Sequence, residues 1–339
     1  MSEEADPAHQ RSAHHVAAPP AVELPFHWLL PLFGGAAAAL VMRLAFSGSP
    51  GQRYSAMLGS FIYLAPVLCG AVTVYLAERS RRRSFWYYLW APWCATALFV
   101  GGTLMIYIEG LICAIVIVPL FALMGSLGGL MMGVVCRVTD WPRPTLYGIA
   151  ALPLLLGAIE PSLPDPQQLS STSRTIFIAA PAERVWQSLN DARDIRPDEV
   201  GDAWAYRIGV PMPMEGRTEE SPEGRVRKVR WQKDVHFDEL ITEWEPSRRV
   251  KWRYRFAPDS FPAGALDDHV VIGGHYFDLR DSAYTLSPRD GGTELRIDVS
   301  WRVSTRFNWY ADRVAHFLLG DFSEHILRFY KARSEAPSA

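Results

Sequence analysis

The chain has 339 residues, a formal net charge of −2 and a hydrophobic fraction of 49%. Charge is unevenly distributed: residues 1–160 hold 9 basic and 8 acidic side chains and no lysine, out of 34 basic and 36 acidic residues in total. This division excludes a single soluble domain and a disordered chain. The near-neutral charge gives no electrostatic reason to expect a nucleic acid as partner. All four cysteines lie in the apolar half, so the second half needs no disulfide and offers no thiol chemistry.

Residues 1–24 are polar, rich in Ala, Pro and His, and show no periodicity, so we expect a mobile tail. The tail lacks the short charged start and apolar core of a signal peptide, and we expect no cleavage there. Its histidines, His9, His14 and His15, are of a metal-binding type, but nothing in the sequence holds them together.

Residues 25–160 are predicted to form an all-α transmembrane region of about five helices. A helix of about 20 apolar residues spans the hydrocarbon core of a bilayer, and the first four apolar runs reach that length. The fifth is the weakest because it is short and contains Pro153. The runs are approximately Phe26–Phe46, Ala56–Ala77, Phe85–Ile108, Leu111–Val135 and Thr145–Ile159.

The arginines between the runs predict the orientation of this region. Short basic loops stay on the cytoplasmic side of a membrane. We therefore expect the N-terminus in the cytoplasm of a bacterium and the C-terminal domain on the periplasmic side of its inner membrane. If the fifth run did not cross, the domain would face the cytoplasm. The basic residues are Arg79, Arg81, Arg82 and Arg83 between runs two and three, and Arg137 and Arg143 between runs four and five.

Gly125, Gly129 and Gly133 form a small-xxx-small pattern in the fourth run. Glycines four residues apart make a smooth helix face that another helix can approach closely. One interpretation is the contact of a homodimer. The favoured one is packing within the chain's own bundle.

The second half is predicted to follow a Pro-rich linker, residues 161–170, and to fold over residues 171–334, with a tail at 335–339. A β-branched strand at Arg174–Ala179 precedes a helix at Ala182–Asn190, and the chain is then irregular or helical up to about residue 225. Alternation predicts five further strands, and steps of three and four predict a last helix with one apolar stripe. These elements are Val226–Lys233, Val235–Glu245, Arg249–Phe256, Tyr276–Ser287, Thr293–Ser304 and the helix Phe307–Ala332.

This order predicts an α+β fold of the helix-grip type, in which a curved antiparallel sheet grips the last helix. The sheet has one apolar face and the helix one apolar stripe, so the economical packing lays the helix in the concavity of the sheet. The space between them is a candidate ligand cavity.

Three segments carry a resemblance to a known family. They are IFIAAPAERVWQSLND from Ile176, FDELITEWEPSRRVKWRYRF from Phe237 and DGGTEL from Asp290. In this order, followed by a long helix, they resemble the START/polyketide-cyclase superfamily (SRPBCC). The resemblance covers about residues 171–334. It implies a helix-grip fold that binds hydrophobic ligands, and some members catalyse cyclisation, dehydration or hydrolysis. It transfers no catalytic residue.

Large aromatic side chains on the strands, facing the stripe of the last helix, are the candidate ligand-binding residues. Such a lining suits an apolar ligand, and a solid core explains the same residues equally well. The candidates are Trp231, Trp244, Trp252, Tyr254, Tyr284, Trp301, Tyr310, Val314, Phe317 and Leu318.

Weak candidates for acid–base catalysis are His236 and Asp238 on one strand, with His269 and His275 in the loop Ala257–His275. Solvated loop residues and structural histidines are the favoured interpretation. No spacing on one regular element suggests a metal site, and we expect no cofactor.

Three hypotheses follow. The leading one is a membrane-anchored protein that binds a hydrophobic molecule or lipid. The second is an enzyme of the cyclase or dehydrase type, which a buried His–Asp pair in the cavity would favour. The third is a ligand-responsive interaction module, which a filled interior with an exposed apolar patch would favour.

Overall fold

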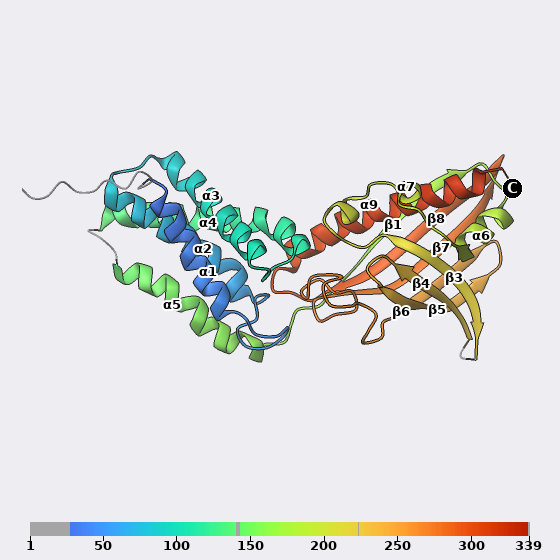
Figure 1. The fold of residues 1–339 in the computed structure, drawn as a ribbon, viewed down its shortest axis with the longest axis horizontal. Helices are drawn as coiled ribbons and strands as arrows, with labels where there is room; N and C mark the ends of the chain where they lie inside the picture. Colours follow the sequence, from blue (N-terminus) through green and yellow to red (C-terminus); the bar gives the residue numbers. More distant parts are fainter. Residues whose placement is uncertain (1–27, 140–142, 223, 338–339) are drawn as a thin grey trace, which may run out of the picture.

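The computed structural model describes residues 28–139, 143–222 and 224–337. The tail expected at residues 1–24 and the end of the tail expected at 335–339 lie outside the described residues. The chain forms a helical region, residues 28–162, followed by a sheet domain, residues 168–337 (Figure 1).

The five long helices of the helical region run alternately toward and away from the sheet domain (Figure 1). α1, α3 and α5 therefore end beside the sheet domain, and α2 and α4 begin there. For example, Glu160, directly after α5, accepts hydrogen bonds from the backbone N–H groups of Gly59 and Ser60 at the start of α2, at 2.7 and 2.9 Å. The helices are α1 Leu30–Ala45, α2 Gly59–Ser80, α3 Phe85–Met105, α4 Leu111–Val138 and α5 Arg143–Ile159, the last continued by the 3-10 turn η1 Glu160–Ser162.

The arginine-rich ends of these helices lie away from the sheet domain. There Arg82 donates to the backbone oxygen of Cys136 at 3.0 Å, and Arg137 donates to the hydroxyl of Tyr88 at 3.2 Å. The loop after α2 and the end of α4 are thus joined at one end of the bundle, and the sheet domain is joined to the other.

Three helical segments of the described chain are long and apolar enough to cross a membrane: Gly59–Ser80, Leu111–Val138 and Arg143–Ser162. The third contains the run that the sequence ranked weakest, and it lengthens because η1 continues α5. α1 is shorter, with 16 residues. α3 is not among the three in the described residues, and its sequence is rich in Trp and Tyr.

The glycines of α4 contact α2 and α3 of the same chain. A Cβ atom at Gly129 would lie 2.5 Å from the backbone oxygen of Tyr88, and one at Gly133 would lie 2.5 Å from the Tyr88 ring. At Gly70 on α2, a Cβ atom would lie 1.9 Å from the oxygen of Gly125. The smooth face therefore allows close packing within the bundle, as the favoured interpretation expected.

The sheet domain contains eight antiparallel strands in the order β1-β8-β7-β6-β5-β4-β3-β2, curled around the long helix α9 (Figure 1). This is the helix-grip arrangement predicted from the sequence. β1 begins within the expected linker, and α9 continues three residues past its expected end. The elements are β1 Gln168–Ile178, α6 Ala182–Asn190, β2 Asp191–Ala192, α7 Pro197–Val200, α8 Trp204–Arg207, β3 Pro213–Ser221, β4 Gly224–Trp231, β5 His236–Glu245, β6 Arg249–Arg255, β7 Phe277–Arg289, β8 Gly292–Val303 and α9 Asn308–Glu335.

The sequence did not predict two strands, the two-residue β2 and the longer β3. β3 is the larger omission. Its sequence, PMEGRTEES, has one large apolar residue and three glutamates, so neither alternation nor β-propensity marks it. It forms because β4 pairs with it from Pro213 to Ser221. Tertiary pairing overrides weak local propensity here.

The side chains of β6 alternate between the two faces of the sheet. Val250 and Trp252 are buried on the concave side, and Trp252 is 3% exposed. The alternate positions on β6 point outward, where Arg249 pairs with Glu243 and Arg255 with Asp238. This alternation fixes which side chains face α9.

Candidate ligand-binding site

A cavity of about 320 Å³ lies between α9 and the concave face of the sheet and continues into the helical region. Its lining is predominantly apolar, as in small-molecule sites, whose volumes are typically about 300–1,000 Å³. The sheet supplies Val229, Phe237, Leu279, Ile297 and Val299; α9 supplies Ala311, Val314, Leu318, Phe322 and Ile326; and the helical region supplies Phe61, Phe99, Val100, Ile117 and Phe121.

A buried ion pair stands in the cavity wall. Nη1 of Arg227 on β4 lies 2.7 Å from a carboxylate oxygen of Glu239 on β5, and the two side chains are 9% and 6% exposed. The second guanidinium nitrogen donates to the hydroxyl of Tyr330 on α9 at 3.1 Å. β3 makes room for this guanidinium, because a Cβ atom at Gly216 would lie 2.2 Å from it.

Aromatic and hydroxyl groups complete this polar cluster, which consists of Arg227, Glu239, Trp252, Tyr254, Ser282, Tyr284 and Tyr330. The Arg227 guanidinium lies 5.4 Å from the centre of the Trp252 ring, and Tyr254 and Ser282 share a hydrogen bond of 2.7 Å. Nε of Arg227 and Nε1 of Trp252 are buried without a well-formed hydrogen bond within the described residues. Because a buried unpaired donor is costly, these N–H groups are available to a polar group of a ligand.

Burial sets the protonation of the titratable groups in this cluster. Burial raises the pKa of Glu239, and the adjacent Arg227 guanidinium opposes that rise. Burial also raises the pKa of Tyr254 and of Tyr330, so both phenols keep their protons near neutral pH. The cluster therefore offers O–H and N–H donors beside one carboxylate acceptor.

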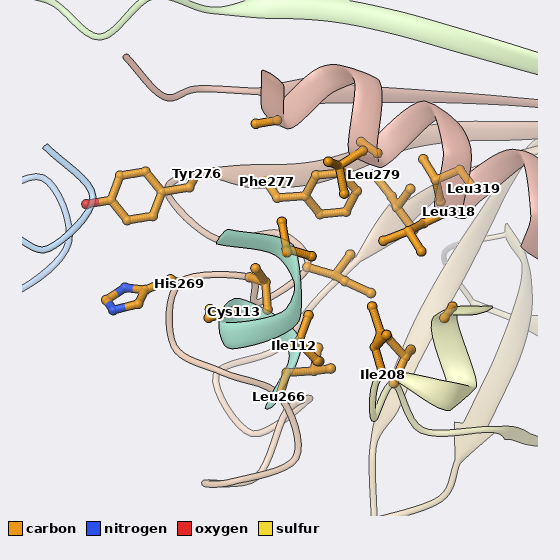
Figure 2. Close-up of a pocket in the computed structure, with 18 of the residues that line it drawn as sticks. Ile112, Cys113, Ile208, Leu266, His269, Tyr276, Phe277, Leu279, Leu318 and Leu319 are labelled. Atoms are coloured by element: carbon orange, nitrogen blue, oxygen red, sulfur yellow. The ribbon is translucent and has the colours of Figure 1, made fainter. Parts of the chain in front are cut away.

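The other end of the cavity is closed by the helical region. Figure 2 shows the first turn of α4, with Ile112 and Cys113, lying between Leu266 of the loop 257–275, Ile208 after α8 and Leu318 of α9. Ile112, Ile208 and Leu266 are buried and belong to one apolar cluster. The hydroxyl of Tyr276 reaches the loop between α1 and α2, where it lies 2.9 Å from Ser55 Oγ.

Three charged or titratable side chains line this same end. Arg43 at the end of α1 pairs with Glu109, after α3, at 2.6 Å. Nε2 of His269 lies 3.9 Å from the other oxygen of Glu109. Burial lowers the pKa of His269, so its imidazole is held neutral. Its Nδ1 has no hydrogen-bond partner within the described residues.

Six of the ten candidate ligand-binding residues line the cavity: Trp231, Trp252, Tyr254, Tyr284, Val314 and Leu318. The other four do not, and each has a different neighbour. Trp244 packs against Trp186 at 4.7 Å, and a bulge after Ile241 sets its direction. Trp301 is fully buried and donates to Asp312 at 3.0 Å. Tyr310 donates to the Val116 oxygen at 2.5 Å, and Phe317 is 53% exposed beside Trp204.

The structure does not bring the four catalytic candidates together. His269 lines the cavity at the helical region. His236 is exposed near Asp259, and Asp238 pairs with Lys228 and Arg255 on the outer face of the sheet. His275 lies 2.9 Å from Asp165, outside the cavity. Within the described residues no group of three or more His, Cys, Asp or Glu side chains is arranged to hold a metal ion.

Sequence reasoning missed Arg227, Glu239 and Tyr330, although alternation carries a signal for the first two. Arg227 shares its face of β4 with Val229 and Trp231. Glu239 shares its face of β5 with Phe237 and Ile241, and the two charged residues are direct partners in the register. The bundle residues Arg43 and Glu109 carried no such signal, because their role depends on how the two regions pack.

No family model and no curated protein matches this chain. Solved structures similar to part of it include a protein of unknown function from Staphylococcus aureus, with 10% identity over 50% of this chain and 95% of that one, and a TM-score of 0.32. A protein from Chromobacterium violaceum has 14% identity over 49% of this chain and 98% of that one, with a TM-score of 0.28. The di-domain ARO/CYC protein StfQ of the steffimycin biosynthetic pathway has 10% identity over 58% of this chain and 61% of that one, with a TM-score of 0.30.

Proposed function

We propose that this chain is a membrane-anchored protein that binds one hydrophobic molecule in the cavity between α9 and the sheet, without transforming it. The observation that carries the proposal is the largely apolar cavity of about 320 Å³ shared by the two regions. A volume at the lower end of the range for small-molecule sites suits one molecule of drug-like or single-chain size.

The proposed ligand has an apolar body and one polar group. The apolar walls would hold the body, and the Arg227–Glu239 cluster would hold the polar group. Nε of Arg227 and Nε1 of Trp252 support this assignment, because a ligand oxygen would give two buried donors a well-formed hydrogen bond.

The helical region would serve as the anchor. Its outward faces are lined by large apolar side chains such as Phe33, Leu123, Met131 and Leu155. In a membrane the arginine-rich ends would remain in the cytoplasm, since short basic loops are retained there. The sheet domain, joined to the other ends of the helices, would then lie outside the cytoplasm.

Titration of the full chain in detergent with the fluorescent fatty acid cis-parinaric acid tests binding in the cavity. We expect saturable binding, read from the fluorescence of the probe itself. Leu318→Trp should weaken it at least about tenfold, because the larger side chain fills the cavity. Phe317→Trp is the matched control, since the neighbouring Phe317 faces solvent.

Saturable binding that Leu318→Trp and Phe317→Trp leave equally intact would place the probe elsewhere and contradict the proposal. So would the absence of binding to the unmodified chain. Conversion of a bound molecule, detected by mass spectrometry, would favour the enzyme hypothesis instead.

A further inference from the structure

A second hollow opens where the two regions meet. This junction groove has a volume of about 760 Å³ and lies between the end of α1, the turn from α3 to α4 and the loop 257–275. Its lining includes polar groups absent from most of the cavity, among them Lys233, Asp267 and Asp268. It is distinct from the cavity but adjacent to it.

The groove and the cavity share a wall. Seven residues line both hollows, so their side chains separate the junction groove from the cavity. Four of them are apolar and buried, and the other three form the cluster of Arg43, Glu109 and His269 described above. They are Ala56, Ile112, Ile208 and Leu266, with Arg43, Glu109 and His269.

This wall is assembled from side chains that meet across the junction. Ile112 comes from the helical region, whereas Leu266 and His269 come from the loop (Figure 2). Arg43 and Glu109 also come from the helical region. Within the described residues no backbone–backbone hydrogen bond joins the loop to the helical region. The wall can therefore part without breaking a helix or a sheet ladder, as lid loops do.

One hydrogen bond between a side chain and the backbone joins the loop to α4 beside this wall. Asp267 accepts a hydrogen bond from the backbone N–H of Cys113 at 2.8 Å and so caps the first turn of α4. Gly110 permits this approach, because a Cβ atom there would lie 1.5 Å from the Asp267 carboxylate. Loss of this cap would leave the loop held to α4 mainly by the apolar contact of Leu266 with Ile112.

The outer rim of the groove is apolar. Met105 at the end of α3 and Ile106 and Tyr107 in the turn that follows are 82%, 51% and 94% exposed. Tyr107 itself lines the groove. In the proposed orientation this turn lies at the non-cytoplasmic membrane surface, where Tyr side chains with an apolar body and a polar tip are favoured. An amphipathic molecule in that leaflet would thus meet the groove before it met the cavity.

We infer that the junction groove is the entrance through which an amphipathic molecule passes from the bilayer into the cavity, and that the seven shared residues are its gate. This inference rests on the proposed function. The polar lining of the groove would receive the polar group of the molecule, and parting of Leu266 from Ile112 would admit its apolar body. The Arg43–Glu109–His269 cluster would lie beside the path.

A reversible lock across the gate tests the inference. An ideal Cβ atom at Gly110 lies 2.2 Å from Cγ of Asp267, so cysteines at these positions are within the reach of a disulfide. The variant is Gly110→Cys with Asp267→Cys, in a chain whose Cys94 and Cys113 are replaced by serine. It is reconstituted in phosphatidylcholine–phosphatidylglycerol vesicles, and the release of preloaded cis-parinaric acid to acceptor vesicles is timed.

We expect the oxidised variant to release the probe at least about tenfold more slowly than the same protein after reduction. The two variants that carry only one of the introduced cysteines should respond to neither treatment. Ile112→Ala should speed release, and Ile115→Ala, on the exposed side of α4, is its control. Equal rates in the oxidised and reduced protein, with the disulfide verified by mass, would overturn the inference and leave the proposed function standing. Failure of the reduced protein to bind the probe would overturn both.

Discussion

The carboxylate of Asp267 in the sheet domain caps the first turn of α4 in the helical region through the backbone N–H of Cys113, at 2.8 Å. These residues are 154 positions apart in the sequence. One hydrogen bond thus links the loop that borders the cavity to a helix that is apolar enough to cross a membrane. The contact makes the mouth of the cavity part of the junction between the two regions.

Removal of this cap should loosen the junction. Asp267→Ala leaves the N–H of Cys113 without its partner, and loss of a helix N-cap typically costs about 0.5–2 kcal/mol. We expect faster amide hydrogen exchange in the first turn of α4, measured by mass spectrometry on the full chain in detergent. Asp268→Ala is the matched control, because Asp268 is exposed. Equal exchange in the two variants would show that the cap does not hold the loop.

The buried ion pair should respond differently to single and double substitution. Arg227→Met leaves the Glu239 charge buried without its partner, and breaking such a pair typically costs about 3–5 kcal/mol. Replacing both residues, by Met and Leu, removes both charges and should cost less than either single change. Thermal unfolding of the sheet domain within the full chain, followed by near-ultraviolet circular dichroism, measures the three variants. A double variant less stable than both single ones would contradict this account.

Alternation along the strands predicted much of this cavity. Val250 and Trp252 both face inward, because residues two apart on a strand share a face. The same rule places Arg227 on the face of Val229 and Glu239 on the face of Phe237. Trp244 does not point in the direction that alternation along its strand predicts, because a bulge between Ile241 and Glu243 shifts the register. Bulges leave no clear mark in the sequence, so alternation predicts directions only up to the next irregularity.

The junction was beyond sequence reasoning for another reason. Each half is defined by its own periodicity, whereas the contacts between them involve single side chains. Arg43, Glu109 and His269 come from three segments that no pattern links. Only the packing of the two regions brings them together at the cavity.

Acidification should destabilise the junction through His269. Burial lowers the pKa of this histidine below its usual 6.5, and the nearby Arg43 guanidinium lowers it further. The carboxylates of Glu109, Asp267 and Asp268 raise it, but by less. The unfolded state therefore binds a proton more readily, and stability falls as the pH drops through about 6.5 toward the folded-state pKa. Above that window both states are neutral and stability is unaffected.

Comparing the pH dependence of the melting temperature between the unmodified chain and His269→Gln isolates the contribution of His269 to stability. The melting temperature of the full chain should fall more between about pH 7.5 and about pH 5.5 than that of His269→Gln, which cannot take up the proton. His236→Gln is the control, because His236 is exposed on the outer side of the sheet. Parallel pH profiles for the unmodified chain and His269→Gln would refute the assignment.

The proposed orientation predicts the behaviour of reporter fusions in a bacterial host. Alkaline phosphatase joined to the end of α9 should be active, because the sheet domain lies at the end of the bundle opposite the arginine-rich loops. The same enzyme joined after Arg83 should be inactive, since that loop would be cytoplasmic. The reverse pattern of activities would place the sheet domain in the cytoplasm.

The central claim is that the cavity holds one apolar molecule, and native mass spectrometry of the full chain purified from membranes tests it most directly. The account predicts one bound non-detergent molecule per chain, retained by Phe317→Trp and lost from Leu318→Trp, whose larger side chain fills the cavity. No bound molecule in the unmodified chain, or equal retention by the two variants, would contradict it.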